Sequence, residues 1–194
     1  MRDAICLASG GLDSTVCLKL MQDQGLRPLP LFINYNQLNY IREFASLQRN
    51  CERLGISAPL ELDFSDLGRN LATGLTDSTK DVVQDAFTPC RNLMFIVAAA
   101  AVGCKLGINK IVMGLLSEKT AIFPDQSDEF IRDAEKAISS SLGINFTVIL
   151  PLRDFIKSEV VELGRRLGVT DFYSCHAGTE IPCGKCIACS EYGG

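Results

Sequence analysis

The stretch that decides the fold is Ser9-Gly10-Gly11-Leu12-Asp13-Ser14-Thr15, near the start of the chain. It follows an apolar run at residues 4–8 and leads into a helical pattern at residues 13–24, an order that predicts a strand, a tight turn and a helix. The two glycines leave no Cβ between backbone and ligand, and the turn amides meet the positive end of the helix dipole. We therefore expect phosphate groups to be held by Ser9, Gly10, Gly11, Asp13, Ser14 and Thr15.

The motif differs from two common phosphate-binding loops. It has no lysine, which a Walker-type loop requires, and it is not G-x-G-x-x-G. The S-G-G-x-D-S pattern resembles the PP-loop of ATP pyrophosphatases, which hold the β,γ-pyrophosphate of ATP as a leaving group. The resemblance implies that Asp13 orients the loop or helps to hold Mg²⁺. The alternative is an ordinary turn whose serine or aspartate only caps a helix.

Length and composition favour one globular domain over residues 1–194, with residues 170–194 as its terminal metal-binding segment. Hydrophobic residues make up 47% and charged residues 22% of the chain, and the net charge is −4. The acidic balance argues against broad binding to nucleic acid or to anionic membranes. With no apolar run of membrane-spanning length and no secretory leader pattern, we expect a cytoplasmic protein.

Apolar strand patterns alternate with helical patterns along the chain. Strands are predicted at residues 4–8, 29–33, 60–62, 110–113 and 146–150, and helices at residues 13–24, 41–54, 91–106, 128–141 and 154–167. This alternation predicts an α/β fold with a doubly wound, mostly parallel five-stranded sheet. Residues 64–89 and 114–128 are predicted as long loops, and the loops after the first four strands should open onto one crevice.

Four cysteines near the end of the chain have the spacing of a metal site. They follow the pattern C-x7-C-x2-C-x2-C and predict a closed structural Zn²⁺ site formed by Cys175, Cys183, Cys186 and Cys189. Disulfides and an iron–sulfur cluster are the alternatives. The lone histidine, His176, is expected on the surface. The remaining cysteines are interpreted as buried apolar residues, with a covalent nucleophile as the alternative for Cys90: Cys6, Cys17, Cys51, Cys90 and Cys104.

Together, the PP-loop, the five βα units and the terminal cysteines resemble the QueC family of 7-cyano-7-deazaguanine synthases. Further similar stretches lie at residues 32–37, at 90–93, at 123–125 with Phe130, at 151–152 with Lys157, and at 174–175, so the resemblance spans nearly the whole chain. It implies an adenine nucleotide alpha hydrolase-like fold and an ATP-dependent C–N ligase. The family adenylates the carboxylate of 7-carboxy-7-deazaguanine, aminates it with ammonia to the amide and the nitrile, and releases AMP and pyrophosphate. The implied cofactors are ATP, Mg²⁺ and Zn²⁺.

The resemblance also implies roles for individual residues. Charge on the phosphates or on the acyl phosphate would be stabilised by the catalytic residues Asp13, Arg91 and Lys157. The substrate would be bound by Tyr35, Gln37, Arg91, Asn92, Phe123 and Asp125. For Arg91 and Asn92 the alternative is that they only begin a helix, and for Lys157 that it lies on a solvated helix face.

Departures from the family pattern cluster in the predicted substrate loops. Cys90 stands where the family usually has glycine, Lys119 where it has an acid, and Leu38-Asn39 where it has a basic pair. A second hypothesis is therefore a relative from antiviral systems that conjugates a 7-deazaguanine to an amine of a partner protein. A non-catalytic ATP-sensing module and a tRNA-thiolating enzyme are further alternatives. A homodimer is kept open, with no nucleic-acid or membrane partner.

Overall fold

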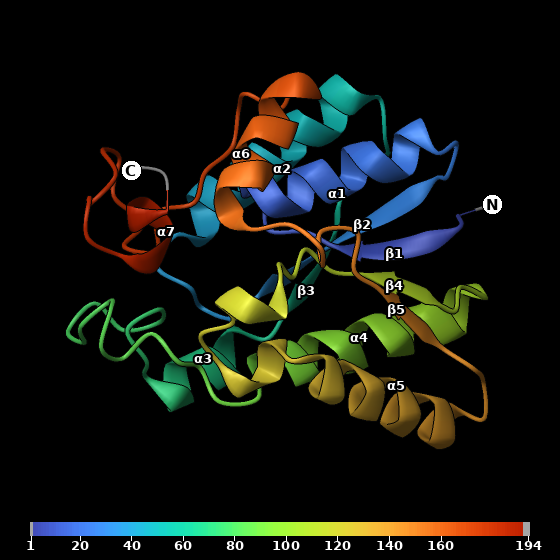
Figure 1. Ribbon diagram of the computed structural model, residues 1–194. Coiled ribbons are helices and arrows are strands. Elements are labelled where there is room, and N and C mark those ends of the chain that lie inside the picture. Colours follow the sequence, from blue (N-terminus) through green and yellow to red (C-terminus); the bar gives the residue numbers. More distant parts are fainter. Residues whose placement is uncertain (1, 192–194) are drawn as a thin grey trace.

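A five-stranded parallel sheet forms the centre of the computed structural model, which describes residues 2–191 (Figure 1). The strands are β1 (Ala4–Leu7), β2 (Pro28–Asn34), β3 (Leu60–Asp63), β4 (Lys110–Val112) and β5 (Thr147–Ile149). They lie in the order β3-β2-β1-β4-β5, and every neighbouring pair is parallel. The predicted sheet is confirmed and is parallel throughout. The order reverses between β1 and β4, where a doubly wound sheet places its ligand crevice.

Helices cover both faces of the sheet. One face carries α1 (Leu12–Asp23), α2 (Tyr40–Leu54) and α6 (Lys157–Arg166), and the other carries α4 (Arg91–Leu106) and α5 (Asp128–Leu142) (Figure 1). Successive strand residues point to opposite faces, so Ile5 packs in the core under α4 and α5 while Cys6 packs with Val16 of α1. The doubly wound arrangement is confirmed. Within residues 2–191, no helix has the length and apolar character needed to cross a bilayer.

The predicted loop at residues 64–89 is an ordered, folded segment. It begins with helix α3 (Ser65–Leu71), and a Cβ at Gly68 of this helix would lie 1.7 Å from the Tyr35 carbonyl oxygen. Only glycine therefore lets α3 approach the loop after β2. Farther along, the buried hydroxyls of Thr73 and Thr88 are 3.0 Å apart. This segment is ordered by hydroxyl hydrogen bonds and a close backbone contact. These contacts do not require apolar residues at regular spacing, so the sequence shows no helix or strand pattern here.

The other predicted loop and the terminal segment also contain short helices. Residues 114–128 include two turns of 3₁₀ helix, η1 (Glu118–Thr120) and η2 (Pro124–Gln126). The terminal segment carries α7 (Ile187–Ser190), which follows Cys186 and contains Cys189. Helices of three or four residues are too short to show a hydrophobic period, so the sequence pattern does not reveal them.

Two of the cysteines interpreted as buried are exposed. Cys6, Cys17 and Cys51 are buried as expected, but Cys104 lies on the solvent face of α4. Cys90 is also exposed, because the chain turns there with φ 58° to begin α4. A left-handed φ favours glycine, which explains why glycine suits this position in the family pattern.

Replacing Cys90 by glycine should stabilise the protein. The substitution removes the Cβ repulsion of the left-handed conformation at φ 58°, and we expect a gain of about 1 kcal/mol and a rise in Tm of about 2–4 °C. Thermal unfolding followed by circular dichroism measures it. As the matched control, Cys104→Gly in the interior of α4 should lower Tm slightly, because glycine is a poorer helix former than cysteine. If the Tm of C90G is at or below that of the wild type, the backbone at position 90 is not strained by the cysteine side chain.

Candidate active site

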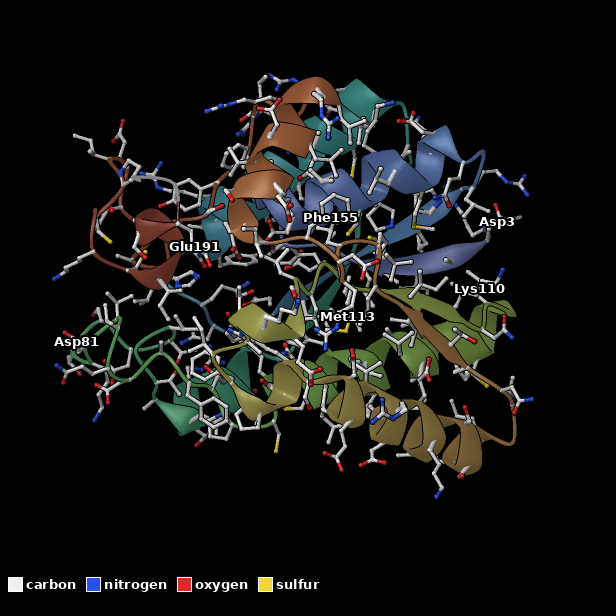
Figure 2. All side chains as sticks on the ribbon, in the orientation of Figure 1. Asp3, Asp81, Lys110, Met113, Phe155 and Glu191 are labelled. Carbon is white, nitrogen blue, oxygen red and sulfur yellow. The ribbon has the colours of Figure 1, made fainter. Side chains whose placement is uncertain are left out.

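The carboxyl ends of the strands open onto one cavity of about 340 Å³. Loops that follow four different strands line it, as the sequence predicts. The PP-loop (residues 9–15) contributes Ser9, and the loop after β2 contributes Tyr35. Leu75 comes from the segment after β3, and Gly114 follows β4. Met113, labelled in Figure 2, lies in the lining between the two helix layers.

Glycine at position 10 fixes the shape of the PP-loop. Its φ is +85°, and a Cβ there would lie 2.3 Å from the carbonyl oxygen of Glu43 in α2. The Ser46 hydroxyl of the same helix donates to the Gly10 carbonyl over 2.8 Å. Inside the loop, the hydroxyls of Ser14 and Thr15 donate to the Gly11 carbonyl over 3.2 and 2.8 Å. The loop is therefore held in its bent form by contacts within the protein.

The six residues predicted to hold phosphate divide into two groups. Three side chains line the cavity, those of Ser9, Asp13 and Ser14. Gly10, Gly11 and Thr15 shape the turn at the start of α1, and the Thr15 side chain is buried. We therefore propose that the first group meets the phosphates directly and that the second places backbone amides around them.

Lys157 joins the PP-loop to the end of the described chain. Its Nζ lies 2.9 Å from both carboxylate oxygens of Asp13 and 3.2 Å from Oε2 of Glu191. The lysine is the first residue of α6, which packs against α1, so two residues 144 positions apart meet at the cavity. Asp13 and Glu191 line the cavity, and the solvated-face interpretation of Lys157 does not hold because its side chain is largely buried.

Arg91 and two residues of the β2 loop form the next part of the wall. The Arg91 guanidinium lies over the Tyr35 ring at 5.9 Å from its centroid. The Gln37 side chain accepts from the Tyr35 backbone N–H over 2.8 Å and donates to the Ile33 carbonyl over 3.3 Å. All three predicted residues line the cavity, and burial raises the pKa of the Tyr35 hydroxyl. The site thus has a cation held over a neutral aromatic ring.

Asn92 and Asp125 contact each other. The Asn92 side-chain amide donates to the Asp125 carbonyl over 3.0 Å, and the Asn92 backbone N–H lies 3.4 Å from Oδ2 of Asp125. Asn92 lines the cavity together with Phe123 and Gln126, and Asp125 is outside the lining. The structure therefore brings the predicted pair together, with the Asp125 carboxylate directed to the first turn of α4.

Among the cavity residues that the sequence analysis missed, two carry ionisable side chains of interest, Glu43 and His176. Glu43 lines the cavity from α2, and burial raises the pKa of its carboxyl to about 8. A signal was available, because Glu43 is in phase with the buried residues Leu47 and Asn50 of the same helix. His176, expected on the surface, is half-buried and lines the cavity. The expectation was wrong because the cysteine cluster folds this segment inward: the His176 backbone N–H donates to Cys186 Sγ over 3.4 Å.

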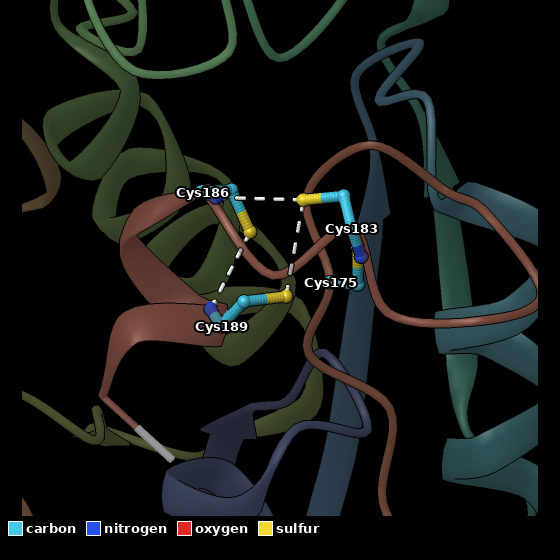
Figure 3. A group of neighbouring side chains, drawn as sticks. All are labelled: Cys175, Cys183, Cys186 and Cys189. Carbon is cyan, nitrogen blue, oxygen red and sulfur yellow. Dashed lines mark hydrogen bonds between the residues drawn. The ribbon is translucent and has the colours of Figure 1, made fainter. Parts of the chain in front are cut away.

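The four clustered cysteines fit a tetrahedral zinc ion (Figure 3). Their Sγ atoms lie within 4.8 Å of one another, and those of Cys183 and Cys189 are 3.9 Å apart. Zn–S bonds of about 2.3 Å require sulfurs about 3.8 Å apart, whereas a disulfide requires about 2.05 Å. Backbone N–H groups donate to three of the sulfurs over 3.3–3.4 Å, as suits thiolate acceptors: Cys175, Cys183 and Cys186.

The cysteine cluster lies next to residues that form part of the cavity wall. Cys175 and Cys186 pack with Val82 of the segment after β3, and α7 places Ile187 and Ala188 in the lining. A zinc ion held by this cluster would therefore fix one side of the cavity. This placement agrees with a structural rather than a catalytic metal, because all four coordination positions would be filled by protein.

Comparison with known proteins gives a match along nearly the whole chain. The model of the family described as queuosine biosynthesis protein QueC matches residues 3–192. A 7-cyano-7-deazaguanine synthase of Campylobacter concisus is 31% identical over 97% of this chain and 91% of its own length. The enzyme of the same name from a Sulfurovum species is 30% identical over 97% of this chain and 90% of its own.

A solved structure supports the fold alone. A 4-thiouridine synthetase, crystallised with RNA and bound ATP, superposes with a TM-score of 0.58 at 19% identity. The match covers 87% of this chain and 41% of the synthetase chain. The architecture is thus shared with a protein crystallised with bound ATP.

The cysteine cluster predicts one zinc ion per chain. We expect Cys183→Ser to lower the zinc content well below one equivalent and Tm by more than about 5 °C, because binding a structural zinc ion contributes folding free energy. Elemental analysis and thermal unfolding measure the two effects. Cys104→Ser, an exposed cysteine outside the cluster, is the control and should keep the metal. Stoichiometric iron with visible absorption would contradict zinc.

The buried carboxyl of Glu43 makes stability depend on pH. Its pKa is about 8 in the folded protein and near 4.5 in the unfolded chain, so between these values unfolding releases a proton and rising pH favours unfolding. From about pH 5 to about pH 9 we expect Tm to fall by several degrees more in the wild type than in Glu43→Gln. Scanning calorimetry across this range tests it. The exposed Glu52→Gln should behave as the wild type, and an equal fall in all three proteins contradicts the prediction.

Proposed function

The chain belongs to the QueC family, and from this premise we propose that it adenylates the carboxylate of 7-carboxy-7-deazaguanine and aminates it to the amide or nitrile. Family membership and the PP-loop fold support an ATP-dependent enzyme that forms C–N bonds. The observation that carries the proposal is one cavity whose lining includes both Ser9 and Ser14 of the PP-loop and the aromatic residues Tyr35 and Phe123. A nucleotide and a flat, aromatic-sized substrate can therefore meet there.

The first step joins two anions, and the site supplies the charges that this requires. The substrate carboxylate oxygen attacks the α-phosphorus of ATP, and pyrophosphate leaves into the PP-loop, where backbone amides receive it. Lys157, now held by Asp13 and Glu191, would turn toward the phosphates, and Arg91 would stabilise the acyl adenylate. When bound beside Asp13, Mg²⁺ would screen the phosphate charges.

The second step forms the C–N bond. Ammonia attacks the acyl carbon, the carbon–oxygen bond to AMP breaks, and the amide remains after loss of a proton. In the nitrile branch the amide oxygen is adenylated by a second ATP, and elimination of AMP leaves the C≡N bond. AMP leaves at each stage because phosphate is a far better leaving group than hydroxide. The walls of the cavity, including α7, would limit hydrolysis of the adenylate by water.

An apolar rim favours a second candidate acceptor. Ile122 lines the cavity mouth and is 57% exposed, and Phe87, 43% exposed, packs its ring against Phe123 at 5.2 Å. Exposed apolar side chains at the mouth of a site are typical of protein contacts. With Lys119 in the same loop, this supports the hypothesis in which a protein amine replaces ammonia.

The reaction predicts which bond of ATP breaks. With Mg²⁺, ammonium and 7-carboxy-7-deazaguanine, we expect AMP and pyrophosphate, measured by chromatography of labelled ATP. Asp13→Asn and Lys157→Ala should each lower kcat by about 10²- to 10³-fold, because both lose charge at the phosphates. Lys136→Ala, an exposed lysine of α5, is the matched control and should keep full activity.

Three outcomes separate the hypotheses. Formation of ADP in place of AMP contradicts the proposed scission. AMP release with a deazaguanine-sized mass added to a protein amine, and no amide or nitrile, favours the conjugating enzyme. ATP binding without turnover on any carboxylate favours the ATP-sensing module.

A further inference from the structure

Glu43 is a cavity carboxyl for which the proposed reaction has no task. It lies on α2 directly behind the PP-loop, where its carbonyl oxygen would be 2.3 Å from a Cβ at Gly10. Its side chain faces the cavity, and the Gln37 amide donates to its Oε2 over 3.4 Å. A carboxyl removed from water is costly unless donors satisfy it. Its presence in the wall therefore calls for an explanation.

The surroundings of Glu43 leave part of its acceptor capacity unused. The other cavity carboxylates, Asp13 and Glu191, are both paired with Lys157. Among residues 2–191, by contrast, no ion pair within 4.0 Å involves Glu43, and its protein donors are the amides of Gln37 and Asn39. A carboxylate accepts about four hydrogen bonds. A ligand in the cavity can thus supply two more.

Two adjacent N–H donors are what a guanine-type base offers. The ring N1–H and the 2-amino group of 7-deazaguanine point the same way, at the spacing of two carboxylate oxygens. Adenine presents an acceptor, N1, at the corresponding place. Since the cavity must hold the adenine of ATP and a deazaguanine at once, a carboxylate in its wall would attract one base and repel the other.

We propose that Glu43 is a specificity-determining residue that accepts hydrogen bonds from the ring N–H and exocyclic amino group of the deazaguanine. The inference rests on the proposed function. It gives Glu43 the recognition task that the sequence assigned to Asp125. The Asp125 carboxylate lies outside the cavity lining and 3.4 Å from the Asn92 backbone N–H, so it positions the start of α4.

Binding of two ligands to the zinc-loaded full chain tests the proposal. The probes are 7-carboxy-7-deazaguanine and its analogue without the 2-amino group, titrated calorimetrically. At about pH 9, where a Glu43 carboxyl of pKa about 8 is ionised, we expect the wild type to prefer the first by about 10- to 100-fold, the size of one or two hydrogen bonds to a charged group. Glu43→Gln keeps the shape but loses the second acceptor, so the preference should fall to within about threefold. ATP affinity, measured on the same protein, should stay unchanged and shows that the variant is folded.

Controls and failures are distinguishable. Glu52→Gln, on the exposed face of the same helix, should keep the wild-type preference, as should Asp125→Asn. A full preference in E43Q, or its loss in D125N alone, overturns this inference and leaves the proposed function standing. A wild type that binds both ligands equally also overturns it, without need of any variant. A wild type that binds ATP but neither ligand overturns the proposed function and the inference together.

Discussion

The contact of the Gly10 peptide with helix α2 is the constraint on which the cavity depends. At this peptide the PP-loop and α2 approach more closely than any Cβ would allow. The Gly10 carbonyl accepts from the Ser46 hydroxyl over 2.8 Å and from the Tyr173 backbone N–H over 3.2 Å. Three distant parts of the chain thus meet on one peptide group. This contact brings Asp13, Glu43 and residues of the cysteine-bearing segment into the wall of one cavity.

Much of the fold could be predicted because apolar residues recur along the sequence at the spacing of a helix or of a strand. The five strands and five longer helices appear where apolar residues recur at the spacing of their element, and the turn after β1 identified the edge of the sheet that carries the cavity. Residues 64–89 could not be predicted in this way. Their order comes from hydroxyl contacts between Thr73, Thr76 and Thr88 and from the approach of Gly68 to Tyr35. Such contacts join residues far apart and leave no local pattern.

Some residues of the candidate site could likewise be predicted from local sequence patterns, and others could not. Motifs with fixed local spacing, the PP-loop and the cysteine cluster, were found from the sequence; the PP-loop lines the cavity and the four cysteine sulfurs lie close together. Arg91 and Lys157 came from family resemblance; the structure places Arg91 in the cavity lining and pairs Lys157 with the lining residue Asp13. Glu43 and His176 were missed because their importance arises only from what folds around them. A charged residue in phase with the buried face of a helix is the signal that would have found Glu43.

The cavity can be completed only late in synthesis, because residues 175–191 form part of its wall. This segment supplies Ile187, Ala188 and Glu191 to the wall, and it is translated only after all five strands of the sheet. A nascent chain can therefore complete its sheet while the nucleotide crevice is still open on one side. The last part of the wall can form only after the four cysteines have emerged from the ribosome. A metal ion bound by these cysteines would then hold that part of the wall in place.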